Sequence, residues 1–196
     1  MVEFAIRTQN QESIMRLAEI MTSLDRDEDG HLGRLLLLLY AFSRNEGKPA
    51  IEGITKLAKL DFLLRYPSYF ERAMRARDVK PQRIPIANFE RNTVEAQMVR
   101  YRFGPWDHRY RRFLNILAAK GLIEIATNGR TILLSLTEEG RRRAERLACD
   151  EAFRPLAARA RLLRDRLDIG ASEIMRFIYK TFPEIATLSY DEAIAS

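Results

Sequence analysis

The stretch from residue 98 to residue 140 constrains the fold of this chain most strongly. It contains a basic amphipathic segment at residues 107–120, and then two short runs of apolar and β-prone residues separated by Asn128-Gly129-Arg130. Asn-Gly between two such runs is typical of a tight hairpin turn. Thr137 and Glu139 follow the second run and indicate the start of another helix. A helix, two hairpin strands and a helix in this order are typical of the second half of a winged helix-turn-helix.

Apolar periodicity predicts further helices on both sides of this stretch. Residues 11–24 have apolar side chains at the i, i+3, i+4, i+7 spacing of one helix face, and residues 31–43 are apolar almost all round, which indicates burial. Residues 51–66 continue the helical pattern, and residues 95–103 suit a short strand or a helix end. The predicted fold is therefore mainly α with a small antiparallel β-wing, a winged helix-turn-helix core with extra N- and C-terminal helices.

These patterns divide the chain into three parts. We expect an N-terminal helical extension at residues 1–30, a winged-helix domain at 31–148 and a C-terminal helical extension at 151–196. Pro81 and Pro85, with few periodic apolar positions around them, indicate an insertion loop at 78–97.

Several residues are expected to mark helix ends. Ser68 and Asp107 are expected to act as helix N-caps. Pro155 suits the first turn of a long helix that Gly170 ends, and Pro183 is expected to stop the last helix.

Charge is distributed unevenly along the sequence. The net charge is +6, yet residues 1–30 contain seven acidic and three basic side chains, whereas residues 98–120 contain six basic and one acidic. This asymmetry predicts a positive face centred on the winged-helix half, suited to an anionic partner. The acidic start is equally compatible with a plain solvated segment.

Composition argues against several other classes of protein. Cys149 is the single cysteine, so neither a disulfide framework nor a cysteine-based zinc site is expected. The leucine run at residues 35–39 is far too short to span a membrane, and no signal peptide is evident, which favours a cytoplasmic protein without membrane contact. There is no glycine-rich phosphate loop, and His31 and His108 lie far apart in the chain. We therefore expect no enzyme activity, no catalytic or metal-binding residues and no cofactor.

The helix at residues 107–120 is the predicted nucleic-acid contact. Placed at 100° per residue, its apolar side chains form one stripe, which would dock the helix on its own domain, and its polar side chains gather opposite. Arginine can reach phosphates or guanine edges, and asparagine can pair with adenine. With a flanking arginine and another at the wing tip, the candidate residues are His108, Arg109, Arg111, Arg112, Asn115 and Arg130. An ordinary solvated face near a protein partner is the alternative.

Two motifs resemble a known family. The sequence KLAKLDFLLRYP at residues 56–67 and the sequence VRYRFGPWDHRY at residues 99–110 are followed by the predicted wing between Gly121 and Leu136. Together they resemble the middle component of bacterial ABC three-component systems, which includes the middle subunit of Lamassu anti-phage and anti-plasmid defence. The resemblance covers about residues 31–183. The same two motifs, followed by Gly-Leu-Ile at residues 121–123, are also similar to a wider group of small bacterial proteins that includes antitoxin-like domains. Residues 121–140 alone fit MarR-like or PadR-like regulators equally well.

The resemblance implies a non-catalytic adaptor. Such a subunit would sit on an SMC- or Rad50-like ATPase subunit and link it to an effector subunit, often a nuclease, with double-stranded DNA passing near the winged helix. The C-terminal helices are the expected ATPase contact, with Arg159, Arg166, Phe177 and Ile178 as candidate partner-binding residues.

Two other functions remain open from the sequence. A stand-alone winged-helix transcription regulator would need a dimer that presents two recognition helices about one helical turn of DNA apart. An antitoxin-like protein would instead mask a toxin.

Overall fold

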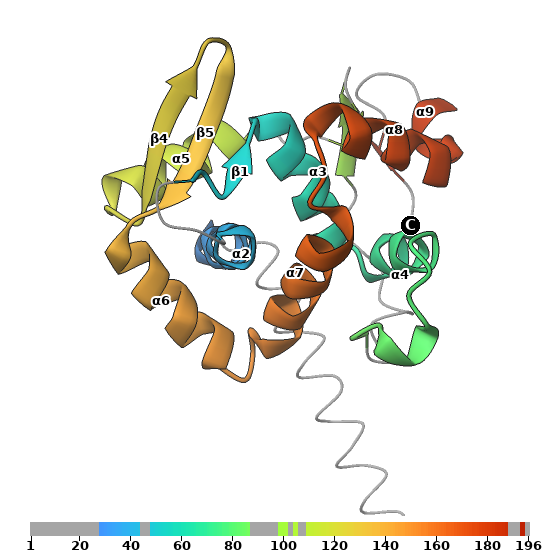
Figure 1. Cartoon of the computed structure of the whole chain (residues 1–196), viewed down its shortest axis with the longest axis horizontal. Helices are drawn as coiled ribbons and strands as arrows, with labels where there is room; N and C mark the ends of the chain where they lie inside the picture. The colour runs from blue at the N-terminus through green and yellow to red at the C-terminus, as the bar shows by residue number, and fades with distance from the viewer. Residues whose placement is uncertain are drawn as a thin grey trace, which may run out of the picture.

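The computed structural model describes residues 28–43, 48–86, 98–101, 104–105, 109–187 and 193–194. Over these residues the chain is mainly helical, with small antiparallel sheets (Figure 1). The helices are α2 (Glu28–Phe42), α3 (Ile54–Arg65), α4 (Pro67–Arg75), the 3-10 turn η1 (Pro81–Arg83), α5 (Tyr110–Ala119), α6 (Glu138–Cys149), α7 (Arg154–Leu167), α8 (Ala171–Thr181) and α9 (Pro183–Thr187). The strands are β1 (Ile51–Glu52), β2 (Met98–Tyr101), β3 (Gly104–Pro105), β4 (Ile123–Asn128), β5 (Thr131–Leu136) and β6 (Ala193–Ile194).

Helix α2 lies at the centre of the molecule. It contacts α3, α5, α6, α7 and β5, and nearly all of its side chains are buried (Figure 1). Its run of five leucines leaves no polar face for solvent, so enclosure by other helices is the arrangement that hides this surface from water. The expectation that residues 31–43 form a buried helix is confirmed. Among the described residues, no helix has the length and apolar character needed to cross a membrane.

One sheet has the strand order β1-β5-β4. Strands β4 and β5 form the predicted hairpin, in which Asn128 pairs with Thr131 across a two-residue turn. Gly129 in that turn has a φ of 57°, a backbone conformation that glycine adopts without steric cost. Strand β1 pairs with β5 on the other side, with Ile51 opposite Leu134. The expected helix at 51–66 is therefore wrong at its start, because its first two residues belong to this sheet.

Strand β2 belongs to the second sheet. It pairs with both β3 and β6 in the order β3-β2-β6. Of the two structures that the sequence left open for residues 95–103, residues 98–101 form the strand.

Helix α4 and the segment after it depart from prediction. Pro67 is the first residue of α4 and Tyr66 is the N-cap, so Ser68 lies inside the helix and does not cap it. Proline suits the first helical position because it has no N–H to leave unpaired there. Residues 78–86 of the expected insertion loop are irregular apart from the turn η1, but they bury Ile84 and Ile86 in the core. Residues 87–97 lie outside the described residues.

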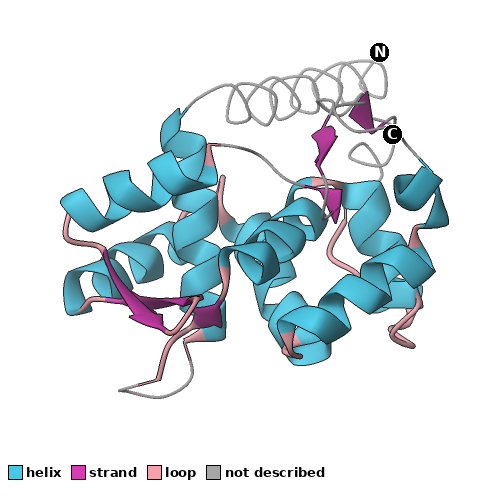
Figure 2. Cartoon of the chain, turned by 90° about the horizontal axis from the view of Figure 1, so that it is seen from above, coloured by secondary structure: helices cyan, strands magenta, loops and turns pink. Residues whose placement is uncertain are grey.

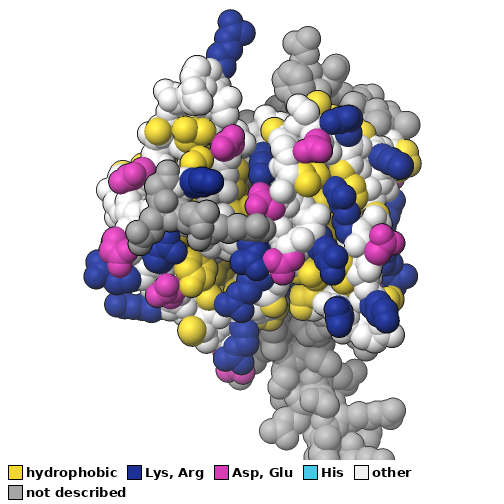
Figure 3. Space-filling view, viewed as in Figure 1, with side chains coloured by type: hydrophobic (Ala, Val, Ile, Leu, Met, Phe, Trp, Pro, Cys, Tyr) yellow, Lys and Arg dark blue, Asp and Glu magenta, His cyan; other side chains and the backbone are white. Residues whose placement is uncertain are grey.

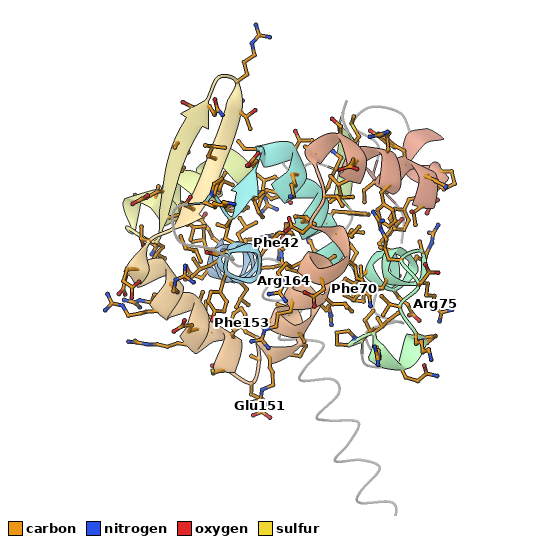
Figure 4. The ribbon with its side chains drawn as sticks, in the orientation of Figure 1. Phe42, Phe70, Arg75, Glu151, Phe153 and Arg164 are labelled. Carbon is orange, nitrogen blue, oxygen red and sulfur yellow. The ribbon has the colours of Figure 1, made fainter. Side chains whose placement is uncertain are left out.

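The C-terminal helices share one core with the rest of the molecule. Ala160, Leu163 and Leu167 of α7 belong to the same buried cluster as α2 and α3. Phe153, between α6 and α7, points toward α2 (Figure 4), where it packs near Leu37. Residues 151–187, within the expected C-terminal helical extension at 151–196, therefore pack into the same core as the preceding helices. Figure 2 shows the β4–β5 sheet at one end of this assembly of helices.

The predicted helix boundaries are largely right in the second half of the chain. The Thr137 hydroxyl accepts a hydrogen bond from the Gly140 amide at 2.9 Å and caps α6 as expected. Pro155 lies in the first turn of α7, and Gly170 separates α7 from α8. Pro183 ends α8 but also begins the short helix α9, which was not predicted. The predicted helix at residues 11–24 and the Asp107 cap lie outside the described residues.

Candidate nucleic-acid interface

Helix α5 has one buried and one exposed face, as its periodicity predicted. Tyr110, Phe113, Leu114 and Leu117 are all buried. Phe113 stacks on the ring of His31 in α2, with ring centroids 5.0 Å apart. These contacts fix which side of α5 faces outward.

The outward face of α5 presents the predicted polar residues. Arg111, Arg112 and Asn115 are exposed. Arg109 is the N-cap and is half-buried, with its guanidinium 5.4 Å from the centre of the Phe113 ring. His108 lies outside the described residues. We call the exposed set Arg111, Arg112 and Asn115 the α5 face.

Arg130 lies apart from the α5 face. It occupies the turn of the β4–β5 hairpin and is exposed. Helix α5 lies behind this hairpin in Figure 1, and contacts β4. The candidate residues thus belong to two neighbouring elements, a helix and a hairpin tip, which together can touch two places on one long ligand.

A buried polar cluster attaches α5 to the two helices beneath it. Arg34 of α2 donates to Asp61 of α3 through Nε at 2.6 Å and through Nη2 at 3.2 Å. The Tyr110 hydroxyl, at the start of α5, donates to the second oxygen of Asp61 at 2.7 Å. All three residues are at most 5% exposed. Charge-assisted bonds in a buried setting are directional, so this cluster fixes the start of α5 relative to α2 and α3.

His31 completes the cluster as a neutral side chain. Arg34 Nη2 donates to His31 Nδ1 at 2.8 Å, because a guanidinium has donors only and the ring nitrogen must accept. Burial and the neighbouring Arg34 charge lower the pKa of His31 from 6.5 to about 4. Burial opposes ionisation of Asp61, but the Arg34 charge and the hydrogen bonds from Arg34 and Tyr110 outweigh it, so the pKa of Asp61 is below its ordinary value.

The low pKa of His31 predicts a loss of stability in mild acid. The unfolded chain takes up this proton near pH 6.5, whereas the folded chain does so only near pH 4. The free energy of unfolding should therefore be fully retained above the unfolded pKa and should fall as the pH drops toward the folded pKa, by up to about 3 kcal/mol. Urea denaturation at a series of pH values across this window measures the effect.

The matched control for this prediction is His31→Asn. Asparagine offers Arg34 an acceptor oxygen but does not titrate, so its unfolding free energy should depend less on pH across the same window. Equal pH dependence in the two proteins would contradict the assignment of the effect to His31.

The buried cluster was missed in the sequence, although the sequence contains a signal for it. Arg34 interrupts the apolar residues of α2, and Asp61 interrupts those of α3. A charge on a helix that is otherwise apolar all round is buried, and a buried charge needs an opposite charge nearby. Arg34 lies on the helix that was predicted to be buried, so it needs an acidic partner, and Asp61 among the apolar residues of the next helix is a candidate.

The predicted partner-binding residues are placed differently from expectation. Arg159 and Ile178 are 0% exposed, so neither is available to a partner and both assignments are wrong. The Arg159 Nε donates to the Pro85 carbonyl at 3.1 Å and so attaches the residues after η1 to α7. Arg166 is exposed, and Phe177 is half-buried with the Arg77 guanidinium 4.5 Å from its ring centre.

Basic side chains are not confined to the α5 face. Figure 3 shows lysines and arginines spread over the visible face and interspersed with acidic and apolar side chains. On α6, Arg142 and Arg143 are exposed and pair with Glu139 at 3.1 and 2.8 Å. Local pairing of this kind partly neutralises these arginines.

A groove of about 790 Å³ lies between α2, the end of α5 and α6. Its lining combines leucines, among them Leu36 and Leu147, with Lys120, Arg143 and Asp29. The part of the chain that the structure describes contains no group of three or more histidine, cysteine, aspartate or glutamate side chains placed to hold a metal ion.

Comparisons with known proteins give no further indication: no family model, no curated protein and no solved structure matches this chain.

Proposed function

We propose that this chain is a winged helix that contacts double-stranded DNA through the α5 face and the β4–β5 hairpin. We further propose that it is a non-catalytic adaptor subunit of an SMC- or Rad50-like ATPase complex. In that role it would bridge the ATPase to an effector subunit, such as a nuclease, in anti-phage or anti-plasmid immunity.

The order and pairing of the elements support the winged-helix assignment. Helix α2, strand β1 and helix α3 come first, and α5, β4 and β5 follow after the intervening α4. Strand β1 pairs with β5, which gives this sheet the order β1-β5-β4. The β4–β5 hairpin therefore lies at one end of the sheet. In this fold the helix before the hairpin enters the major groove of DNA, and here that helix is α5.

The observation that supports DNA contact best is the pairing of an anchored helix with an exposed basic face. Tyr110, at the start of α5, donates to the buried Asp61. On the other side of the helix, Arg111, Arg112 and Asn115 are exposed. Phosphate contacts by arginine supply most non-specific affinity, and a fixed helix places those contacts in register along the groove.

The adaptor role rests on the resemblance of the two motifs, and residues exposed on the surface are the candidates for a partner contact. The first motif forms most of α3, and Lys56, Asp61 and the apolar residues between them are buried. This motif therefore specifies the fold and leaves partner contacts to exposed residues such as Arg166.

Charge reversal on the α5 face should abolish most DNA affinity. Arg111→Glu with Arg112→Glu removes two phosphate contacts and adds two repulsions, so we expect the association constant to fall by at least about tenfold. The slope of its logarithm against the logarithm of salt concentration should decrease by about 2. Fluorescence anisotropy with a labelled random-sequence duplex over a range of salt concentrations measures both.

Arg142→Glu with Arg146→Glu on α6 is the matched control for this reversal. Both arginines are exposed, and the change in net charge is the same. It should alter the affinity and the salt slope much less. Equal effects of the two double variants would mean that net charge, and not the α5 face, determines binding.

The adaptor role is tested by affinity purification of the tagged chain from its native host, with mass spectrometry of the bound proteins. We expect a large coiled-coil ATPase and a second subunit. Recovery of the chain alone, as a dimer enriched at one promoter, would favour the stand-alone regulator.

Interface variants for this experiment should be exposed residues. Truncation of residues 151–196 is unsuitable because it removes α7 and α8 from the core. Arg166→Glu is the informative variant, and Arg83→Glu, exposed in η1, is its control.

A further inference from the structure

An ion pair joins the α5 face to the start of α2. Arg112 Nη2 lies 2.6 Å from Glu28 Oε2. The Arg112 side chain is 68% exposed and that of Glu28 is 40% exposed, so water and ions reach both groups. Such a pair is weak and readily exchanged, unlike the buried pair of Arg34 and Asp61.

Glu28 accepts one hydrogen bond from the Arg112 guanidinium, through Nη2 at 2.6 Å. A phosphate oxygen would form the same kind of charge-assisted bond. The carboxylate and a phosphate cannot both accept from this N–H at once. DNA that accepts a hydrogen bond from this N–H of Arg112 must therefore displace Glu28.

We propose that Glu28 is an internal competitor for Arg112, which a polyanion displaces when it binds the α5 face. The proposal rests on the proposed DNA contact and adds its regulation. An isolated anion that accepts from this N–H gains only the Arg112 contact and replaces Glu28 to obtain it. A nucleic acid duplex also reaches Arg111 and the hairpin tip at Arg130, so it gains several contacts for the loss of one. The competitor thus favours polyanions over single anions.

Glu28 also has a structural role in α2, and the test must distinguish that role from competition for Arg112. Glu28 and Asp29 are both acidic residues in the first turn of α2, where negative charge stabilises a helix. Asp29 lines the groove beside α6. Asp29→Asn therefore matches Glu28→Gln in its place in the first turn of α2 and in charge change, but it leaves the ion pair of Arg112 and Glu28 intact.

The test measures DNA affinity of the full-length chain with the same labelled duplex at low salt. Glu28→Gln should raise the association constant by about two- to fivefold, the range expected for the loss of an exposed ion pair. Asp29→Asn should raise it less, by the general effect of one added net positive charge. Equal gains in the two variants would overturn the proposal.

A second measurement asks whether the gain depends on Arg112. In an Arg112→Ala background, Glu28→Gln should no longer raise the affinity beyond the Asp29→Asn value, because the competed group is gone. A gain that persists without Arg112 would overturn the proposal even if the first measurement supported it.

The outcomes distinguish this proposal from the proposed function. If wild type binds DNA and Glu28→Gln binds equally, only the competitor is wrong. If wild type binds DNA and Glu28→Gln binds it about two- to fivefold more tightly, both the DNA contact and the competitor are supported. If neither variant binds, both the DNA contact and the competitor are wrong.

Discussion

Asp61→Asn is expected to lower the free energy of unfolding by about 3 to 5 kcal/mol, the cost of removing one partner from a buried ion pair. The substitution keeps the shape of the side chain but removes its charge. Arg34 is then a buried cation whose principal counter-charge is lost, since its side chain is only 6% exposed. Urea denaturation at neutral pH, followed by circular dichroism, gives the difference directly.

Two further variants show whether charge pairing causes the loss. Glu139→Gln removes a carboxylate that pairs with exposed arginines, and should cost much less than Asp61→Asn because solvent screens these pairs. The double variant Arg34→Met with Asp61→Leu removes both charges and should be more stable than Asp61→Asn, because no buried charge is left without its partner. A double variant that is less stable than the single one would contradict this account.

Gly140→Ala is expected to destabilise the fold by at least about 3 kcal/mol, although alanine ordinarily stabilises a helix relative to glycine. A Cβ at this position would lie 2.8 Å from the carbonyl carbon of Leu122 and closer still to its oxygen. These are backbone atoms between α5 and β4, and they cannot rotate away as a side chain would. Either α6 or the chain at Leu122 would have to move. Thermal and urea denaturation measure the cost.

Gly170→Ala is the comparison for this variant. The nearest atom to a Cβ there is the carboxylate oxygen of Glu173 at 3.2 Å, at the end of a flexible side chain. Gly170 is the N-cap of α8, where alanine is a modest loss, so we expect about 1 kcal/mol or less. If Gly140→Ala were equally mild, the close approach of α6 to Leu122 would be wrong.

The features that sequence predicted well depend on neighbours a few residues apart. The buried stripe of α5, from Tyr110 to Leu117, follows from helical periodicity alone. The turn at Gly129 and the cap at Thr137 depend on residue types at fixed local offsets. Most of the α5 face could therefore be predicted before any tertiary contact was known.

The features that sequence missed depend on contacts between distant residues. Strand β1 is only two residues long, and its strand character comes from pairing with β5 some eighty positions later, as Ile51 does with Leu134. Residues 78–86 have no periodic pattern of their own and are held by the core and by Arg159. The sequence near β1 does not identify β5 as its partner, and the sequence at residues 78–86 does not identify Arg159.

For Arg159, the residue type led to a wrong prediction of exposure. Arginine is mostly exposed in proteins, so it was assigned to the surface. Its position, however, is four and eight residues before Leu163 and Leu167, which places it on the buried stripe of α7. The spacing of Arg159 from the apolar residues of α7 predicts its burial, whereas its charge predicted exposure.

The central position of α2 has a consequence for biosynthesis. Its five consecutive leucines are covered by helices that extend as far as α7, so they stay exposed on the ribosome until the chain has been made through about Leu167. Burial of these leucines then waits for residues far along the chain, and the apolar surface exposed until that point favours aggregation of incomplete chains. We expect nascent chains of this protein to depend on chaperones until α7 has emerged.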